Sequence, residues 1–263
     1  MKVVLFCGGF GTRMWDHERN VPKPMVEIGY RPLLWHVMRY YAHFGHNDFI
    51  LCLGYKADVI KDYFLKYTEA TSNDFVLTGG DQVELLSQDI RDWRITFVDT
   101  GLSNPVGDRL LQVKDHLAGE ERFLVNYSDG LTDLDLNQVI DVHRDSGSVL
   151  TALLAKPTSS FHVMRTEGDT IKGVEHIVDS ETWINGGYFV TDPRIFDYLN
   201  PGEDLVPDGF PKLIADGQLT GYKYDGFWTA MDTFKDRQRL EKLHAEGSPP
   251  WQVWANDRPP VPV

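Results

Sequence analysis

The chain has 263 residues, of which 42% are hydrophobic and 25% are charged, a composition typical of a soluble globular protein with a large core. Its formal net charge of −13 argues against nucleic acid as the main partner, because a phosphate backbone requires a basic protein surface. The sequence has no apolar run near the roughly 20 residues of a membrane span, and its N-terminus lacks the pattern of a secretory signal. We therefore expect a cytoplasmic protein without a membrane partner.

Strands and helices are predicted to alternate along the first part of the chain. The spacing of Leu34, Val37, Met38 and Tyr41 is typical of an amphipathic helix, and short apolar runs are typical of buried strands. The expected strands are residues 2–7, 48–53, 75–78, 94–99, 122–126, 149–154 and 183–190, and the expected helices are 33–45, 57–67, 108–117 and 135–144. This alternation predicts an α/β fold with a mainly parallel sheet that helices cover on both faces.

The pattern becomes less regular after residue 150. A hairpin is expected within residues 165–175, with its turn at Gly168, and a helix is expected over residues 234–245. No linker is evident between these segments. We therefore expect one main domain over residues 1–225, followed by a C-terminal helix and tail over residues 226–263.

The cysteines and the C-terminal tryptophans indicate how the chain packs. Cys7 and Cys52 lie in or beside apolar runs, so they are expected to be core residues and not a disulfide. The C-terminal tail contains Trp251 and Trp254. These tryptophans either contact a partner subunit or fold back on their own chain, or the tail is partly disordered.

A glycine-rich loop follows the first predicted strand. It contains Gly8, Gly9, Gly11, Thr12 and Arg13. Glycines allow the backbone to approach a ligand closely, so that successive N–H groups can point at phosphate oxygens, and the planar fork of an arginine suits a phosphate. The loop is therefore a candidate phosphate site, although a simple turn after a strand has the same glycine content.

A lysine follows this loop at a restricted position. Lys23 lies between Pro22 and Pro24, which limit the backbone and would hold the ammonium in a fixed place. The spacing of the loop differs from the P-loop and from the dinucleotide-binding G-x-G-x-x-G motif. The loop and lysine therefore indicate neither a P-loop NTPase nor a nucleotide-dependent oxidoreductase.

The order of these motifs resembles a known enzyme family. The segment GGFGTR followed by KPMVEIG resembles the signature of the sugar-1-phosphate nucleotidyltransferases. The segments PLLWHVM, FILCLGYKADVIKDYF, WRITFVDTG, INGGYFV and GFWTAMDTFKD are most similar to its glucose-1-phosphate cytidylyltransferase branch. The resemblance implies transfer of CMP from CTP to a sugar 1-phosphate or a similar phosphorylated acceptor, with release of pyrophosphate.

The resemblance also implies a structure and a set of binding residues. The core would be Rossmann-like, with a small β-rich acceptor region and a C-terminal helical extension, and the protein would form homo-oligomers. Gly8, Gly9, Gly11 and Thr12 would line the nucleotide. Arg13 would brace the triphosphate and the leaving pyrophosphate. Lys23 would contact the α-phosphate and the acceptor phosphate.

Two distant aspartates match the metal ligands of the family. Asp129 follows a predicted strand, and Asp232 precedes the last predicted helix. The resemblance implies that they bind one Mg²⁺ ion together, whereas the residues alone leave Asp232 open as the N-cap of that helix. Arg109 matches an arginine of the cytidylyl branch and is a candidate nucleotide contact. The alternative is a solvated arginine at a helix start.

The acceptor side departs from the family pattern. The resemblance implies an acceptor site that contains His162, Glu175, His176, Asn185, Gly186 and Gly187. In it, His162 replaces a usual glycine and His176 replaces a usual lysine that contacts phosphate. Either the loop is shifted and Lys172 or another cation substitutes, or the acceptor is smaller than, or differs in shape from, glucose 1-phosphate.

Two other functions compete with this interpretation. Nucleotidyltransferase-like domains also occur as catalytically silent regulatory subunits, and the same fold serves thymidylyl- and uridylyltransferases. The presence of Arg13, Lys23, Asp129 and Asp232 favours an active enzyme.

Overall fold

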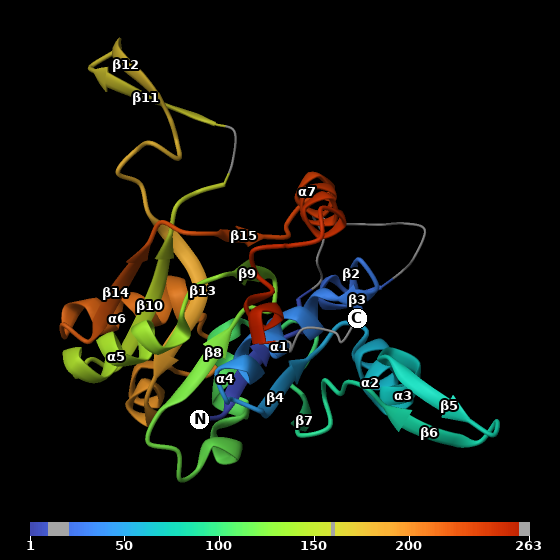
Figure 1. The fold of residues 1–263 in the computed structure, drawn as a ribbon. Coiled ribbons are helices and arrows are strands. Elements are labelled where there is room, and N and C mark those ends of the chain that lie inside the picture. The colour runs from blue at the N-terminus through green and yellow to red at the C-terminus, as the bar shows by residue number, and fades with distance from the viewer. Residues whose placement is uncertain (10–20, 159–160, 258–263) are drawn as a thin grey trace.

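A computed structural model of the chain describes residues 1–9, 21–158 and 161–257 (Figure 1). Its centre is a seven-stranded sheet. In spatial order the strands are β14 (Leu219–Tyr224), β10 (Leu150–Ala155), β13 (Ile184–Thr191), β8 (Phe123–Asn126), β1 (Val3–Phe6), β4 (Asp48–Leu53) and β7 (Arg94–Asp99). Strand β13 runs antiparallel to its neighbours β10 and β8, and the other neighbouring pairs are parallel. The prediction of a mainly parallel sheet is confirmed.

Helices cover both faces of this sheet because its central strands are apolar on both sides. In β1, Val3 and Leu5 face one hydrophobic cluster, while Val4 and Phe6 face the other. The first cluster contains residues of α1 (Leu33–His43), α2 (Ala57–Lys66) and α5 (Leu136–Ser146). The second contains residues of α4 (Val106–Gln112) and α6 (Phe210–Ala215).

Shorter elements complete the described part of the chain. The remaining strands are β2 (Glu27–Ile28), β3 (Arg31–Pro32), β5 (Phe75–Thr78), β6 (Gln82–Leu85), β9 (Gly130–Thr132), β11 (His162–Glu167), β12 (Thr170–His176) and β15 (Trp228–Ala230). The remaining helices are α3 (Glu69–Ser72), α7 (Phe234–Ala245), the 3₁₀ turns Lys23–Met25, Lys114–Leu117, Pro193–Tyr198 and Val253–Asp257, and a π-helical turn at Leu205–Gly209. The hairpins β5–β6 and β11–β12 extend from the body of the molecule (Figure 1).

Most expected elements are present, with one correction. The bounds expected for β4 and α7 agree with the structure, and a hairpin turns near Gly168 as predicted. The single helix expected over residues 108–117 is wrong. It is divided because Val113 leaves the helical conformation, with φ −99° and ψ 5°, before a separate 3₁₀ turn begins.

The described part of the C-terminal tail, up to residue 257, folds back on its own chain. Trp251 is 1% exposed, and its indole N–H donates to Nδ1 of His36, 3.3 Å away on α1. The ring of Trp254 packs edge-on against Trp35, with a centroid distance of 5.9 Å.

The division of the chain into two parts at residue 225 stays a prediction. Within the described residues, no helix is long and apolar enough to span a bilayer.

Candidate active site

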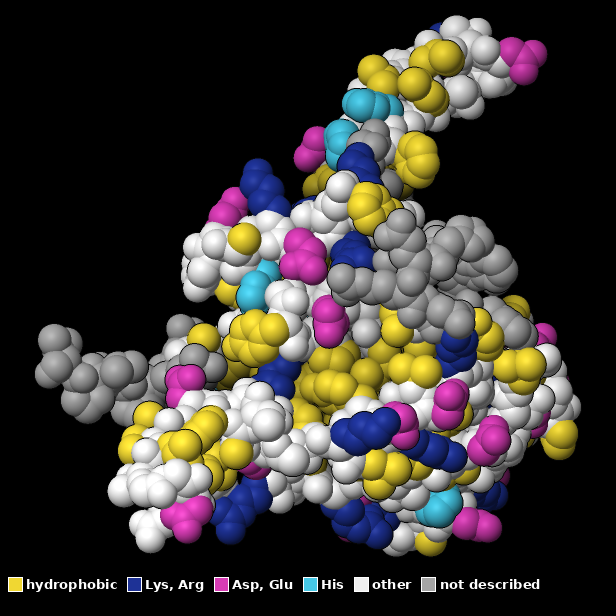
Figure 2. Space-filling view, turned by 90° about the vertical axis from the view of Figure 1, so that its right-hand side faces the viewer, with side chains coloured by type: hydrophobic (Ala, Val, Ile, Leu, Met, Phe, Trp, Pro, Cys, Tyr) yellow, Lys and Arg dark blue, Asp and Glu magenta, His cyan; other side chains and the backbone are white. Residues whose placement is uncertain are grey.

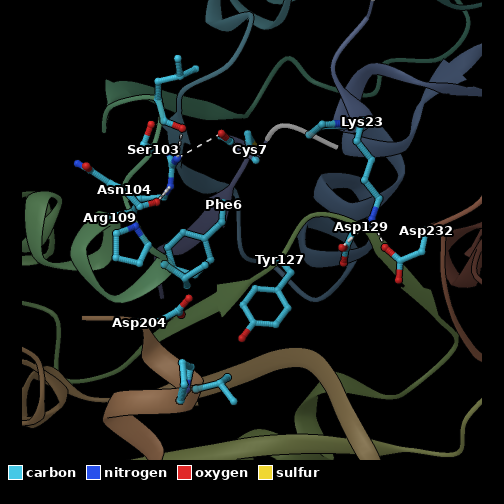
Figure 3. Close-up of a pocket in the computed structure, with 18 residues that line it drawn as sticks. Phe6, Cys7, Lys23, Ser103, Asn104, Arg109, Tyr127, Asp129, Asp204 and Asp232 are labelled. Atoms are coloured by element: carbon cyan, nitrogen blue, oxygen red, sulfur yellow. Dashed lines mark hydrogen bonds and ion pairs between the residues drawn. The ribbon is translucent and has the colours of Figure 1, made fainter. Parts of the chain in front are cut away.

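A cavity of about 650 Å³ opens at the carboxyl ends of the parallel strands (Figure 3). This is the edge at which open α/β sheets bind ligands. The structure brings six of the predicted residues together in its lining, namely Gly8, Gly9, Lys23, Arg109, Asp129 and Asp232. Gly11, Thr12 and Arg13 lie outside the described residues.

Gly8 is a glycine because Arg109 lies directly beside it. A Cβ atom added to Gly8 would be 2.0 Å from Nη1 of Arg109, a distance too short for a non-bonded contact. Gly54, after β4, is also crowded: an added Cβ would lie 2.8 Å from the carbonyl oxygens of Gly101 and Gly8 and 3.0 Å from the same Nη1. Glycine at these two strand ends therefore makes room for one buried arginine.

The buried Arg109 side chain forms hydrogen bonds with several segments around the cavity. It is 4% exposed, so the alternative of a solvated arginine is wrong. All five of its N–H groups donate within the protein. The acceptors are the carbonyl oxygens of Gly8, Leu53, Leu102 and Asn104 and the hydroxyl of Thr100, at 2.9 to 3.3 Å. Burial lowers the pKa of Arg109, but a guanidinium remains cationic in proteins. The residue therefore fixes the ends of β1, β4 and β7 and places a positive charge beside the cavity.

A strained turn after β8 directs Asp129 toward the cavity. Ser128 has φ 63°, a left-handed conformation that non-glycine residues adopt rarely. The amide of Ser128 donates to Oδ1 of Asn126 at 2.6 Å, and its hydroxyl lies 3.6 Å from the Cys7 thiol. Burial raises the pKa of that thiol to about 12. The turn is thus held from two sides, which keeps Asp129 in place.

Lys23 bridges the two predicted metal ligands. Its ammonium donates to Oδ2 of Asp129 at 2.9 Å and to Oδ1 of Asp232 at 2.6 Å (Figure 3). Burial alone lowers the pKa of Lys23, but the two carboxylates outweigh burial and raise that pKa above its usual value. Burial raises the pKa of Asp129, and Lys23 opposes this shift. Two residues far apart in the sequence therefore meet at one cation.

The backbone around Asp232 explains how the second carboxylate is positioned. The amide of Met231 donates to the carbonyl of Asp129 at 2.8 Å, which joins the two segments directly. Thr233, and not Asp232, is the N-cap of α7. Its hydroxyl accepts a hydrogen bond from the amide of Asp236, and the Asp236 carboxylate accepts one from the amide of Thr233. The alternative in which Asp232 caps the helix is wrong, and its carboxylate contacts Lys23 in the cavity instead.

The donor set suits Mg²⁺. Within the described ranges, no three or more His, Cys, Asp or Glu side chains form a group that would hold a metal ion. At the ammonium of Lys23, the described residues supply two carboxylates, Asp129 and Asp232. Mg²⁺ is usually held by one or two carboxylates together with substrate phosphates and water. The pair therefore fits a cation that binds together with a nucleotide.

The start of β13 contacts Tyr127, one of the residues that line the cavity. The Asn185 side chain accepts from the amide of Gly187 at 2.9 Å and donates to the Tyr127 hydroxyl at 3.4 Å. Gly187 has φ 73°, and an added Cβ would lie 2.8 Å from the Tyr127 ring. The Gly186 carbonyl accepts from the Trp228 indole at 2.9 Å. Asn185, Gly186 and Gly187 are not part of the cavity lining; Asn185 and Gly187 contact Tyr127, which is, so the acceptor role of these three residues stays a prediction.

The remaining predicted acceptor residues lie on the β11–β12 hairpin. His162 and His176 are directly opposite each other, with ring centroids 5.2 Å apart. Glu175 pairs with Arg165 at 3.3 Å. Lys172, the possible substitute cation, pairs with Glu167 at 3.4 Å on the same hairpin. Apolar side chains and histidines gather on this hairpin in Figure 2, away from the body. The structure does not bring it to the cavity, so its acceptor role stays a prediction.

Sequence reasoning missed several cavity residues. Tyr127 lies two residues before Asp129, so its place close to a predicted metal ligand was the available signal. Asn104 and Asp204 also line the cavity. Both lie in irregular segments, where the sequence has no periodicity that would indicate a ligand-facing side chain.

Comparisons with known proteins agree with this geometry. The family model described as nucleotidyl transferase matches residues 2–236. A Bacillus subtilis protein named "Probable glucose-1-phosphate cytidylyltransferase" is 40% identical over 257 residues, which cover 97% of this chain and 100% of the relative. The glucose-1-phosphate cytidylyltransferase of Salmonella typhi is 36% identical over 256 residues, with the same coverage. The crystal structure of HddC from Yersinia pseudotuberculosis has a TM-score of 0.66 at 21% identity and covers 92% of this chain and 99% of its own.

Proposed function

This chain belongs to the nucleotidyl transferase family, and from that premise we propose that it transfers CMP from CTP to a sugar 1-phosphate and releases pyrophosphate. The observation that carries the proposal is the meeting of Lys23, Asp129 and Asp232 in one cavity beside the glycines after β1. The choice of CTP and of a glucose 1-phosphate-like acceptor is supported by the names of the two full-length relatives.

The proposed reaction is an in-line displacement at phosphorus. An oxygen of the acceptor phosphate, already ionised at pH 7, forms a new bond to the α-phosphorus of CTP. The bond from that phosphorus to the oxygen bridging to the β-phosphate breaks, and pyrophosphate leaves with the electron pair. A strong general base is not required, so the task of the protein is to position the reactants and neutralise charge.

Each residue has a role in this scheme that follows from its place. Gly8 and Gly9 let the nucleotide approach the end of β1, and Arg109 keeps that wall in position. Lys23 would contact the α-phosphate and the acceptor phosphate as a point charge. Asp129 and Asp232 would hold Mg²⁺, which when bound would neutralise phosphate charge. Arg13 keeps its proposed role at the triphosphate on the sequence resemblance alone.

A pyrophosphate-release assay tests the proposal. The purified protein would be supplied with Mg²⁺, one of several sugar 1-phosphates including glucose 1-phosphate, and one of CTP, dTTP, UTP, ATP or GTP. We expect the highest kcat/KM with CTP. The Asp129→Asn variant, purified in parallel, controls for a contaminating enzyme. A preference for dTTP or UTP would contradict the cytidylyl assignment. CTP binding without turnover of any sugar phosphate would favour a silent regulatory subunit.

Association into homo-oligomers is part of the same proposal. Its support is the family resemblance. Trp251 and Trp254 do not add to that support, since both are buried within their own chain. Light scattering on the purified protein would measure its mass directly.

A further inference from the structure

One ammonium and two carboxylates form the charged centre of the cavity. Lys23 Nζ contacts one oxygen of Asp129 and one oxygen of Asp232, both within hydrogen-bond distance. The Lys23 side chain is 14% exposed, while those of Asp129 and Asp232 are 31% and 44% exposed. The lysine is therefore the more enclosed partner, and both carboxylates keep a side open to the cavity.

A single ammonium and a divalent cation compete for the same negative charge on Asp129 and Asp232. Two carboxylates carry two negative charges, and the ammonium neutralises one of them. A divalent cation would neutralise both, and like charges at such separations repel strongly where solvent is partly excluded. Lys23 and the divalent cation therefore each weaken the binding of the other to Asp129 and Asp232.

The side chain of Lys23 can leave without disturbing its backbone. Its 3₁₀ turn begins after Pro22, and backbone bonds from Met25 to Pro22 and from Val26 to Lys23 hold the turn. The flexible four-carbon stem of a lysine allows the ammonium to move several ångströms by rotation alone. Lys23 itself lines the cavity, so a displaced ammonium stays within it.

We infer that Lys23 is a displaceable counter-ion: it competes with a divalent cation for Asp129 and Asp232, and is released toward the substrate phosphates when that cation binds. The inference rests on the proposed function for the identity of the phosphates. It couples two requirements of the site, because the cationic side chain becomes available to substrate only when the carboxylates have another partner. Until then, the contact restrains the ammonium.

The first test measures Mn²⁺ binding by electron paramagnetic resonance, without nucleotide or acceptor. Removal of the competing charge in Lys23→Met should tighten Mn²⁺ binding about fivefold or more relative to the unmodified protein. The Lys66→Met variant is the matched control, because it removes the same charge from an exposed ion pair with Asp62 on α2. Its affinity should stay within about twofold of the unmodified protein.

The outcomes of this titration are decisive. Equal or weaker Mn²⁺ binding by Lys23→Met, or an equal gain in Lys66→Met, overturns the inference. Equal Mn²⁺ affinity of Asp129→Asn and the unmodified protein would mean that the ion binds at another site, and this result also overturns the inference. Because no substrate is present, this result is independent of the proposed function: failure of cytidylyl transfer would reject that function and leave the competition unchanged.

The second test uses the unmodified protein and so does not depend on a variant that folds. Lysine acetylation by acetic anhydride would be measured by mass spectrometry with and without Mg²⁺ at one pH. We expect the Lys23 rate to rise about threefold or more with Mg²⁺, since the ammonium loses two ion-pair partners, while Lys66 serves as the internal reference. An unchanged or slower Lys23 rate overturns the inference.

Discussion

The guanidinium of Arg109 occupies the space beside Gly8 that a side chain would need, since a methyl group on Gly8 would lie 2.0 Å from Nη1. The carbonyl of Gly8 accepts from Nη2 of the same arginine at 3.2 Å. Glycine is therefore required here by the protein itself, before any nucleotide binds. The arginine in turn depends on the glycine, because all five of its N–H groups are used in this arrangement.

The first prediction follows from this contact. In Gly8→Ala the new methyl group would push the guanidinium from its acceptors and leave buried carbonyls unpaired. We expect the free energy of unfolding in urea to fall by about 2 kcal/mol or more, and CTP binding to weaken in calorimetry. Gly9→Ala is the matched control for stability, because no atom of the described residues lies within 4 Å of its added Cβ. Equal stability of the two variants would contradict the proposed fit.

The second prediction concerns the two carboxylates. Asp129→Asn and Asp232→Asn should each remain folded, because both side chains are partly exposed and an amide has nearly the same shape. Each loses a charged ligand for the proposed Mg²⁺ ion, so kcat should fall by about 10²-fold or more. Steady-state pyrophosphate release at limiting Mg²⁺ measures this. Full activity in either variant would remove that residue from the site.

The third prediction separates strain from chemistry at Ser128. A β-branched residue is poorly accommodated at φ 63°, whereas glycine adopts this conformation freely. Ser128→Val should therefore lose about 2 kcal/mol or more of stability and lower kcat, because Asp129 is the next residue. Ser128→Gly should keep kcat within about twofold, since it keeps the backbone conformation. The idea fails if valine at residue 128 is tolerated in both urea unfolding and turnover.

The sequence predicted those parts of the fold where local pattern and tertiary environment agree. The strand β4 is a continuous apolar run that is buried on both faces, and α7 begins with a capping box. Strand β14 was missed because its sequence, LTGYKY, contains a glycine and is only half-buried, so it lacks a clear apolar pattern. The pair β9–β15 was missed because each strand has three residues.

The site was predictable where a motif carries it, and less so where distant segments meet. The family resemblance identified Lys23, Asp129 and Asp232, and the structure brings them together. The contact between Arg109 and Gly8 could not be predicted from the sequence, because the acceptors of Arg109 come from three separate segments of the chain. Most of them are backbone carbonyls, which carry no sequence signal. A motif marks which residues matter, while packing determines how they act.

The last prediction concerns the acceptor and the two histidines of the β11–β12 hairpin. His162 and His176 replace a glycine and a lysine of the family pattern, and the structure makes them cross-strand neighbours. A change at one position therefore alters the surroundings of the other, which favours a coordinated change over independent drift. If this pair faces the acceptor in the working enzyme, imidazole at residue 162 would fill space that a hexose needs.

We therefore predict weak turnover of glucose 1-phosphate and better turnover of another phosphorylated acceptor. The double variant His162→Gly with His176→Lys should raise kcat/KM for glucose 1-phosphate, because it restores space and a permanent charge. Thr166→Gly with Thr170→Lys, near the turn of the same hairpin, controls for a general effect of such changes. If the unmodified enzyme already reaches about 10⁴ M⁻¹s⁻¹ with glucose 1-phosphate, near the lower end of the usual enzyme range, the altered-acceptor idea is wrong. The ordinary acceptor would then be bound by a cation other than His176.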